Sequence, residues 1–367
     1  MSTALEDLEV RQILSPEGVV DPALDPKLSD ELLLKIYRTM IATRVMDERM
    51  LALQRQGRIF FYLCCTGQEA CAIGVGAALT DEDWVVPGYR QPGLFLYRGI
   101  TPKQIVSQCF GNAWDNTKGR QMPVHYSFAS HNLVSISSPI GTQLIQAAGV
   151  AMAMRRRGDK KVAVSFIGDG GTSSSDFHAG LNFAAVDKAP AIFVCENNGW
   201  AISCPTSKQT ASQTFAQKAV AYGMPGVRVD GNDALAVYQA THEARERALA
   251  GGGPTLLELV TFRLAGHSSS DDPTRYIPAE VFEAKQKLDP VTRFKTYLEG
   301  KGLWDDEQDV AFRKSARDEV NTAIRDNERV AKPELVSLFS DVYEHMPADL
   351  KAALEAEQEA RGEGKFP

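Results

Sequence analysis

Polar residues directly follow two apolar segments that lie near each other in the chain. Asp169 stands between glycines in "FIGDGG", after the apolar run 162–167, and Asn198 ends "APAIFVCENN", after the apolar run 191–195. The helical sequence "DFHAGLNFAAV" separates the two runs, so the segment is typical of one β-α-β unit. A right-handed crossover makes the two strands parallel and places both following loops at the same edge of the sheet. We therefore expect Asp169 and Asn198 to converge.

The chemistry that this pattern favours is the binding of a magnesium-bridged diphosphate. Gly168, Gly170 and Gly171 let a ligand approach the backbone, and the helix that follows directs free amides at an anion. A carboxylate beside a phosphate oxygen is repelled by about 4 kcal/mol at roughly 4 Å and an effective dielectric constant of about 20. Mg²⁺ removes this conflict, because it prefers hard oxygen ligands such as Asp169, the Asn198 amide and a neighbouring backbone carbonyl.

A dinucleotide-binding fold is the main alternative, because it also places glycines between a strand and a helix. A GxGxxG motif counted from Gly168 requires glycine at position 173, where the chain has Ser173. That fold also requires an acid about 20 residues further on, at the end of the second strand. Glu196 comes 28 residues after Gly168 (196 − 168 = 28). The spacing therefore favours the diphosphate site over a nicotinamide cofactor.

Composition limits the class of protein. The chain has 367 residues and a net charge of -7, so no overall cationic field attracts nucleic acid or anionic lipid. Its six cysteines form no CxxC pair, which favours reduced thiols over a disulfide framework or a zinc site. The acidic start lacks the features of a signal peptide, and no run approaches the length of a membrane span. We expect a soluble, cytoplasmic protein that binds neither nucleic acid nor membrane.

Changes in composition and in the spacing of apolar residues divide the chain into three regions. Residues 1–29 are rich in Pro and Asp and predict an extended arm that needs another surface to order it. From 30 to 289 a long amphipathic helix, capped by Ser29 or Asp30, precedes alternating apolar runs and helical stretches, which predicts an α/β fold with a parallel sheet. Residues 290–367 are charged and helical, and predict a helical C-terminal extension.

The predicted strands come from four apolar runs. These are "DWVVPGYR", "KKVAVSFIGDG", "APAIFVCENN" and "PTLLELVTFRLAGH". The first and the last of these runs end in polar residues that are able to bind a ligand or take part in catalysis. Tyr89 and Arg90 follow the first run, and His267 follows the last, in the polar loop "GHSSSDDPTRY" of a kind that orders around a ligand. A neutral imidazole with a pKa near 6.5 can donate to a phosphate and exchange protons at working pH.

The motif GDG, followed about thirty residues later by NN, resembles the signature of enzymes that use thiamin diphosphate with magnesium. From Glu31 to the C-terminus, the chain resembles the alpha subunit of the decarboxylating component of branched-chain 2-oxo acid dehydrogenase complexes. The segments that carry the resemblance are "QRQGRIFFY", "GRQMPVHY", "ISSPIGTQ", "GHSSSDD" and "LFSDVYEHMP". The resemblance implies a parallel-sheet thiamin diphosphate-binding fold with helices on both faces of the sheet.

The resemblance also implies roles for individual residues. Asp169, Asn198 and the backbone carbonyl of Trp200 are the implied magnesium ligands, and His267 and Tyr89 are the implied catalytic residues. The implied cofactor-binding residues are Tyr89, Arg90, Ser138, Ile140, Gly168, Asp169, Gly170, Gly171, Asn198, Ala201, Ile202 and His267. Among these, the aliphatic Ile140 matches a wedge that enforces the bent shape of the cofactor. The positions that match a monovalent-cation site in some relatives are Ser137, Thr142 and Gln143.

Several positions limit what the resemblance carries over. Glu196 stands where some members of the family place an arginine against the diphosphate, and Ile277 stands where an arginine often ends the loop after His267. Ser268 matches a serine that is phosphorylated in mitochondrial relatives, and we take it here as an unmodified hydroxyl. The sequence leaves open whether His125 is structural or functional.

The chain contains one cofactor-binding module, whereas thiamin enzymes need a second module that protonates the pyrimidine ring. The resemblance implies that a separate beta subunit supplies it, in an assembly of two alpha and two beta chains. The implied reaction is decarboxylation of a branched-chain 2-oxo acid, followed by reductive acylation of a lipoyl group on an acyltransferase partner. Pyruvate or acetoin dehydrogenase alpha subunits share the cofactor site and stay open as alternatives, as does a non-catalytic assembly subunit that retains the fold.

Overall fold

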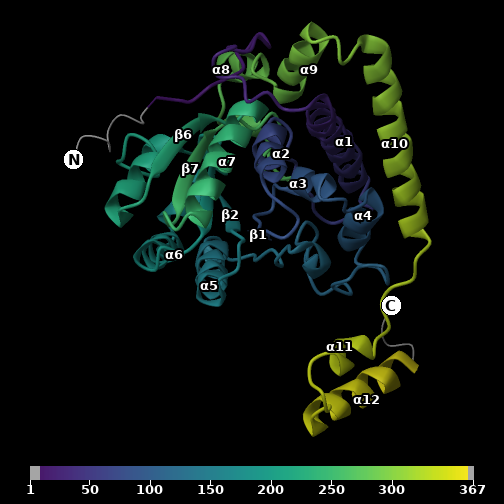
Figure 1. Cartoon of the computed structure of the whole chain (residues 1–367). Coiled ribbons are helices and arrows are strands. Elements are labelled where there is room, and N and C mark those ends of the chain that lie inside the picture. The colour runs from purple at the N-terminus through teal and green to yellow at the C-terminus, as the bar shows by residue number, and fades with distance from the viewer. Residues whose placement is uncertain (1–8, 363–367) are drawn as a thin grey trace.

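The computed structural model describes residues 9–362. Within them, a five-stranded parallel sheet has the order β1-β2-β3-β7-β6, and a short antiparallel hairpin is formed by β4 and β5 (Figure 1). The strands of the main sheet are β1 (Trp84–Val86), β2 (Ala163–Gly168), β3 (Ala191–Asn197), β6 (Gly226–Asp230) and β7 (Thr255–Val260). The hairpin strands are β4 (Trp200–Ala201) and β5 (Cys204–Pro205). All four runs predicted as strands are strands. The fifth, β6, was missed because "GVRVD" is short and half polar.

Helices cover both faces of the sheet, as Figure 1 shows. Those on one face are α5 (Thr142–Arg157) and α6 (Ser175–Val186), and those on the other include α2 (Glu69–Ala78) and α7 (Ala234–Leu249). The side chains of β3 alternate between the two cores: Ile192 and Val194 pack in the core with α2 and α7, and Phe193 and Cys195 in the core with α5 and α6. This burial on both faces explains why the central strands are continuous apolar runs.

A second layer of helices braces the α2 side of the sheet. Helix α1 (Asp30–Arg55) is capped by Ser29, whose side chain accepts a hydrogen bond from the Leu32 amide, in agreement with the predicted cap. The other helices of this side are α3 (Pro92–Tyr97), α4 (Pro102–Phe110), α8 (Ala279–Gln286), α9 (Pro290–Gly300) and α10 (Asp306–Glu328). Helix α10 lies along α1 and α4, and the Tyr37 hydroxyl donates to Asp309 across the α1–α10 contact at 2.8 Å. Side chains of α9 and α10 share the main core with α1.

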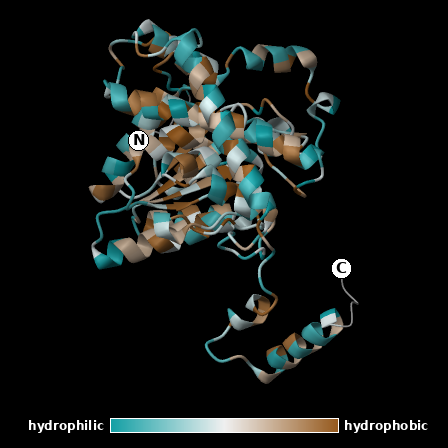
Figure 2. Cartoon of the chain, turned by 90° about the vertical axis from the view of Figure 1, so that its right-hand side faces the viewer, coloured by the Kyte–Doolittle hydropathy of each residue, from teal (hydrophilic) through white to brown (hydrophobic). Residues whose placement is uncertain are grey.

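The last helices stand away from the rest of the chain. Helices α11 (Ser337–Ser340) and α12 (Ala348–Gly362) form a small unit beyond the end of α10, which is separate from the body in both views (Figures 1 and 2). It is attached through polar contacts, in which Lys118 and Arg120 pair with Asp341. Figure 2 shows that hydrophobic residues gather in the sheet, whereas α12 carries mixed polarity. Among the described residues, no helix has the length and apolar character that a membrane crossing requires.

The described part of the N-terminal arm is ordered by its own chain. Arg11 forms a parallel bridge with Val229 of β6, so the arm extends the edge of the sheet. The buried Asp233, which caps α7, also accepts hydrogen bonds from the amides of Ile13 and Leu14, both at 2.6 Å. The sequence predicted that the arm needs another surface. For residues 10–20 that surface is the end of β6 and the start of α7 and α9.

Replacing Asp233 with alanine is expected to lower the free energy of unfolding by about 3 kcal/mol, because four backbone amides and the buried Arg293 guanidinium lose a partner. Urea unfolding of the full chain measures this value. The matched control is Asp305→Ala, an exposed cap of α10, with an expected loss of about 1 kcal/mol. Equal effects of the two substitutions contradict the anchoring of the arm by Asp233.

Candidate active site

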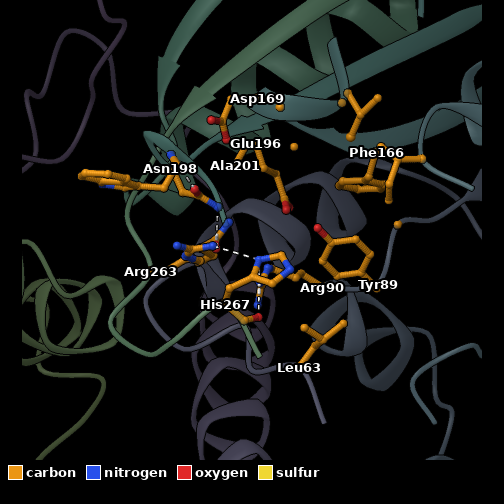
Figure 3. Close-up of a pocket in the computed structure, with 18 of the residues that line it drawn as sticks. Leu63, Tyr89, Arg90, Phe166, Asp169, Glu196, Asn198, Ala201, Arg263 and His267 are labelled. Carbon is orange, nitrogen blue, oxygen red and sulfur yellow. Dashed lines mark hydrogen bonds between the residues drawn. The ribbon is translucent and has the colours of Figure 1, made fainter. Parts of the chain in front are cut away.

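Four loops at the carboxyl edge of the sheet enclose a cavity of about 370 Å³ (Figure 3). They follow β1, β2, β3 and β7, whose parallel arrangement directs all four loops to one edge. Of the twelve implied cofactor-binding residues, every one except Ser138 lines this cavity, as does Trp200. The structure therefore gathers residues that span positions 89 to 267 of the sequence.

Asp169 and Asn198 meet in this cavity, as the β-α-β pattern predicted. Gly168 and Glu196 are paired in the β2–β3 register, so the residues that follow them emerge side by side. Both residues line the cavity, and Gln209 Nε2 donates to Asp169 Oδ2 at 2.8 Å. Asp169 is only 1% exposed, and burial raises the pKa of its carboxyl group. No salt bridge in residues 9–362 reaches this carboxylate, so its buried charge favours a bound cation.

The donor set around Asp169 suits magnesium with a diphosphate. The described residues contain no cluster of three or more His, Cys, Asp or Glu side chains that could hold a metal ion by themselves. Asp169 and the Asn198 amide supply hard oxygen ligands, and the Trp200 carbonyl was the third ligand implied by the sequence. Mg²⁺ commonly keeps several positions for phosphate oxygens and water, so a small protein donor set fits it. Trp200 itself lines the cavity, and its amide donates to Asn198 Oδ1 at 3.2 Å.

Gly170 and Gly171, which follow β2, stand where a side chain does not fit. A Cβ atom added to Gly170 falls 2.4 Å from the Ala201 Cβ atom, and one added to Gly171 falls 2.4 Å from Ile167 Cγ1 and 2.9 Å from Ile140 Cγ2. These approaches are closer than real Cβ contacts allow. Gly170 and Gly171 therefore explain how the 3-10 turn Asp169–Ser173 packs between Ala201 and Ile140 at the cavity wall.

A cationic cluster lies opposite the glycines. Arg90 Nη2 lies 3.2 Å from His267 Nδ1, and Arg263 Nη1 lies 3.0 Å from the same atom (Figure 3). Arg90 also donates to the His267 carbonyl at 2.6 Å. Guanidinium groups can only donate hydrogen bonds, so Nδ1 accepts and the proton of the neutral ring is on Nε2. Tyr89 packs against the same ring, with centroids 6.2 Å apart. Arg90, Arg263 and His267 all line the cavity, so this side of the site is cationic and suits an anion.

The surroundings of His267 also set its protonation state. Burial lowers the pKa of the imidazole to about 4, and the neighbouring Arg90 and Arg263 guanidiniums lower it too. The sequence predicted a pKa near 6.5 and proton exchange at working pH. In the structure the ring is neutral near pH 7 and can donate a hydrogen bond through Nε2.

The side chains of Tyr276, Asp271 and Arg263 hold the loop after His267, without a polar contact from the side chain of Ile277. The Tyr276 hydroxyl donates to Asp271 Oδ2 at 2.6 Å and accepts from Arg263 Nη2 at 3.2 Å, and the His267 amide donates to the same Asp271 oxygen at 2.6 Å. Ile277, at the position where an arginine was considered, is 5% exposed and packs inward. Ser268 is half-buried, and its hydroxyl accepts from the Ser270 amide at 3.3 Å.

Ser138 lies outside the cavity lining and is paired with His125. Its hydroxyl is 2.7 Å from His125 Nε2, and His125 Nδ1 is 3.1 Å from the Pro123 carbonyl. Because that carbonyl can only accept, Nδ1 donates and Nε2 accepts from Ser138. In the predicted monovalent-cation segment, Gln143 Oε1 accepts from the Gly141 amide at 3.1 Å, and its Nε2 donates to the Phe166 carbonyl at 2.9 Å. The cation stays a prediction.

Glu196 lies within the cavity wall, at the position where some members of the family place an arginine. It is 4% exposed and accepts from Gln91 Nε2 at 3.0 Å through Oε2, whereas Oε1 has no partner among the described residues. Burial raises the pKa of this carboxyl to about 7, against the opposing effects of Gln91 and Arg90. The contact between a cationic side chain and the diphosphate at this position is therefore absent.

Sequence reasoning missed several residues of the cavity. They are Leu63, Gln68, Gly88, Gln91, Phe166, Ile167 and Arg263. Arg263 carried a usable signal, because a charged residue directly after the buried run "TLLELVTF" needs a partner or a ligand. Leu63 and Gln68 carried none, because they precede the first strand and reach the cavity through the packing of α2.

The lowered pKa of His267 predicts a pH-dependent contribution to stability. Its folded pKa of about 4 lies below the unfolded value of 6.5, so the contribution is complete above pH 6.5 and is lost as the pH falls towards 4. We expect the stability advantage of the wild type over His267→Gln to shrink by about 1 kcal/mol between about pH 7.5 and about pH 5, a value discounted because the ring is partly exposed. Urea unfolding at both pH values tests this, and an advantage that grows at low pH contradicts it.

Comparison with known proteins shows which family the chain is similar to. A model of the family "Dehydrogenase E1 component" matches residues 37–336. The 2-oxoisovalerate dehydrogenase subunit alpha 1 (mitochondrial) of Arabidopsis thaliana is 46% identical over 342 residues, which are 93% of this chain and 72% of that protein. The corresponding subunit alpha of Bos taurus is 42% identical, over 96% of this chain and 78% of its own length. A pyruvate dehydrogenase E1 component subunit alpha of Staphylococcus aureus is 44% identical, over 96% and 93%. The chain belongs to the dehydrogenase E1 component family.

Proposed function

We propose that the chain is the alpha subunit of a branched-chain 2-oxo acid dehydrogenase, acting on 2-oxoisovalerate and related 2-oxo acids with thiamin diphosphate and Mg²⁺. The observation that carries the proposal is the convergence of Asp169 and Asn198 beside a glycine turn, opposite Arg90, Arg263 and His267. Asp169 and Asn198 suit the metal ion of a metal-bound diphosphate, and the hydrogen-bond donors on the opposite side suit its phosphate oxygens. Family membership and the 2-oxoisovalerate dehydrogenase relatives support it.

Each group of residues has a physical task in this proposal. Asp169, Asn198 and the Trp200 carbonyl hold Mg²⁺, while the absence of side chains at Gly170 and Gly171 lets the turn after Asp169 pack closely against Ala201 and Ile167 beside the site. His267 Nε2–H and the two arginines stabilise negative charge in a partly enclosed site, where such interactions are stronger than in water. When bound, thiamin diphosphate supplies the electron sink for decarboxylation of a 2-oxo acid. Tyr89 and His267 line the side of the cavity where a substrate can contact the cofactor.

A beta subunit completes the site in this proposal, in an assembly of two alpha and two beta chains. At the cavity mouth, Ile140 and Ile202 are 47% and 56% exposed, although large apolar side chains at a ligand site are usually covered. A partner chain over this mouth buries them and excludes water from the reaction. The acceptor of the acyl group is the lipoyl group of an acyltransferase. The relatives carry both mitochondrial and bacterial names, so the cytoplasmic location stays a prediction.

Magnesium-dependent binding of thiamin diphosphate tests the site. In calorimetry on the chain assembled with its beta chain, Asp169→Asn is expected to lower the affinity at saturating Mg²⁺ by more than about a hundredfold, because a direct ligand matters more than an outer one. Without cofactor, Asp169→Asn is expected to unfold at the same or a higher temperature, because a buried charge is removed. The control is the exposed Asp318→Asn on α10. Unchanged binding by Asp169→Asn excludes the proposed site.

The substrate is tested by decarboxylation with the same assembly. We expect kcat/KM for 3-methyl-2-oxobutanoate to exceed that for pyruvate by at least about tenfold, because each extra buried methylene group contributes binding in a fitted pocket. A preference for pyruvate favours the second candidate, a pyruvate dehydrogenase alpha subunit, which the staphylococcal relative supports. Cofactor binding without turnover of any 2-oxo acid favours a non-catalytic assembly subunit.

A further inference from the structure

Each of the two side chains predicted to bind magnesium is held by a glutamine. Gln209 Nε2 donates to Asp169 Oδ2 at 2.8 Å and to the Cys204 carbonyl at 2.9 Å. On the other side, Asn198 Nδ2 donates to Gln68 Oε1 at 3.3 Å. Gln68 is 1% exposed and precedes α2, whereas Gln209 lies just after the β4–β5 hairpin. The two glutamines thus reach the same site from segments about 140 residues apart (209 − 68 = 141).

The hydrogen bonds fix which atom of each amide faces the site. The Trp200 amide can only donate, so the Asn198 atom that it contacts at 3.2 Å is the oxygen Oδ1. The Asn198 NH₂ group therefore faces Gln68 and donates to the Gln68 oxygen. Gln68 Nε2 takes no part in this contact. At Gln209, a carboxylate and a carbonyl both accept, so Nε2 faces them and Oε1 is left over.

The two leftover atoms are buried without a partner in the described part of the chain. Buried polar atoms are nearly always hydrogen-bonded, so an unpaired one at the wall of a cavity indicates a bound group. Gln68 lines the cavity, and its free Nε2–H suits an anionic oxygen. Gln209 Oε1 lies 3.9 Å from the position of a Cβ atom on Gly170, beside the glycine turn, and suits a donor such as metal-bound water.

We propose that Gln68 and Gln209 are the positioning residues of the metal site and that Gln68 also donates a hydrogen bond to the bound diphosphate. Gln209 holds one oxygen of Asp169 and leaves the other for Mg²⁺. Gln68 holds the Asn198 amide with its oxygen towards the site. Outer partners of this kind orient metal ligands and determine much of the affinity. This inference rests on the proposed function, because it takes Asp169 and Asn198 as ligands.

Substitutions at Gln68 separate its two roles. Gln68→Glu keeps an oxygen for Asn198 but replaces the free donor with an anionic acceptor, whereas Gln68→Met removes both. For the chain assembled with its beta chain, Mn²⁺ is titrated at saturating thiamin diphosphate, and thiamin diphosphate at saturating Mg²⁺, by calorimetry and electron paramagnetic resonance. Gln68→Glu is expected to lose about tenfold to a hundredfold in thiamin diphosphate affinity but less than about threefold in Mn²⁺ affinity. Gln68→Met is expected to lose both.

Gln209→Met is expected to weaken Mn²⁺ binding by about tenfold or more, because Asp169 loses its orientation. Gln286→Met, at an exposed position of α8, is the matched control and is expected to change neither affinity. Thermal unfolding checks each variant. If Gln68→Met does not fold, Gln68→Glu and the half-buried Gln209→Met decide the question. Wild-type affinities in those two variants overturn this inference alone, whereas wild-type affinities in Asp169→Asn overturn the proposed function.

Discussion

The parallel register between β2 and β3 is the constraint on which the site depends. Gly168 and Glu196 lie side by side in this register, and the next residues of both strands leave the sheet at its carboxyl edge. A shift of one residue turns every side chain of a strand to the opposite face. Both strands are buried on both faces, with Ile192 and Phe193 in different cores, so such a shift places the wrong volumes in both cores. The core packing therefore holds Asp169 and Asn198 together.

Charge is distributed unevenly around the cavity that this register creates. The buried Asp169 lies on the glycine side and has no ion pair within the described residues, whereas Arg90 and Arg263 lie on the other side with His267 between them. The two guanidiniums force His267 Nδ1 to accept, and burial together with their positive charge keeps the ring neutral. In the proposed function, a metal-bound diphosphate interacts with both sides at once. This arrangement explains why the carboxylate and the arginines are separated and do not neutralise each other.

Long-range contacts support the site from behind. The segment that carries Gln68 is anchored by Glu69, whose carboxylate accepts from the Gly67 amide at 2.9 Å and from Arg44 of α1 at 2.5 Å. Arg44 in turn pairs with Asp289, which caps α9, at 2.9 Å. Helix α1 thus connects the cavity wall to the C-terminal helices. The boundary predicted at residue 289 marks a change in amino-acid composition, but the helices after it pack into the same core as the residues before it.

The sequence by itself determined the strands that frame the cavity, the cap of α1 and the convergence of Asp169 with Asn198. These depend on local periodicity and on the right-handed crossover, both of which are readable from residues close in the chain. Tertiary structure alone decided the rest. It placed Leu63 and Gln68 at the cavity, paired Ser138 with His125 outside the lining, added β6 to the sheet edge, and lowered the pKa of His267. The reason is that a pKa or a hydrogen bond depends on groups that packing brings together, such as Arg90 and His267, which are 177 residues apart, and local sequence carries no signal for such contacts.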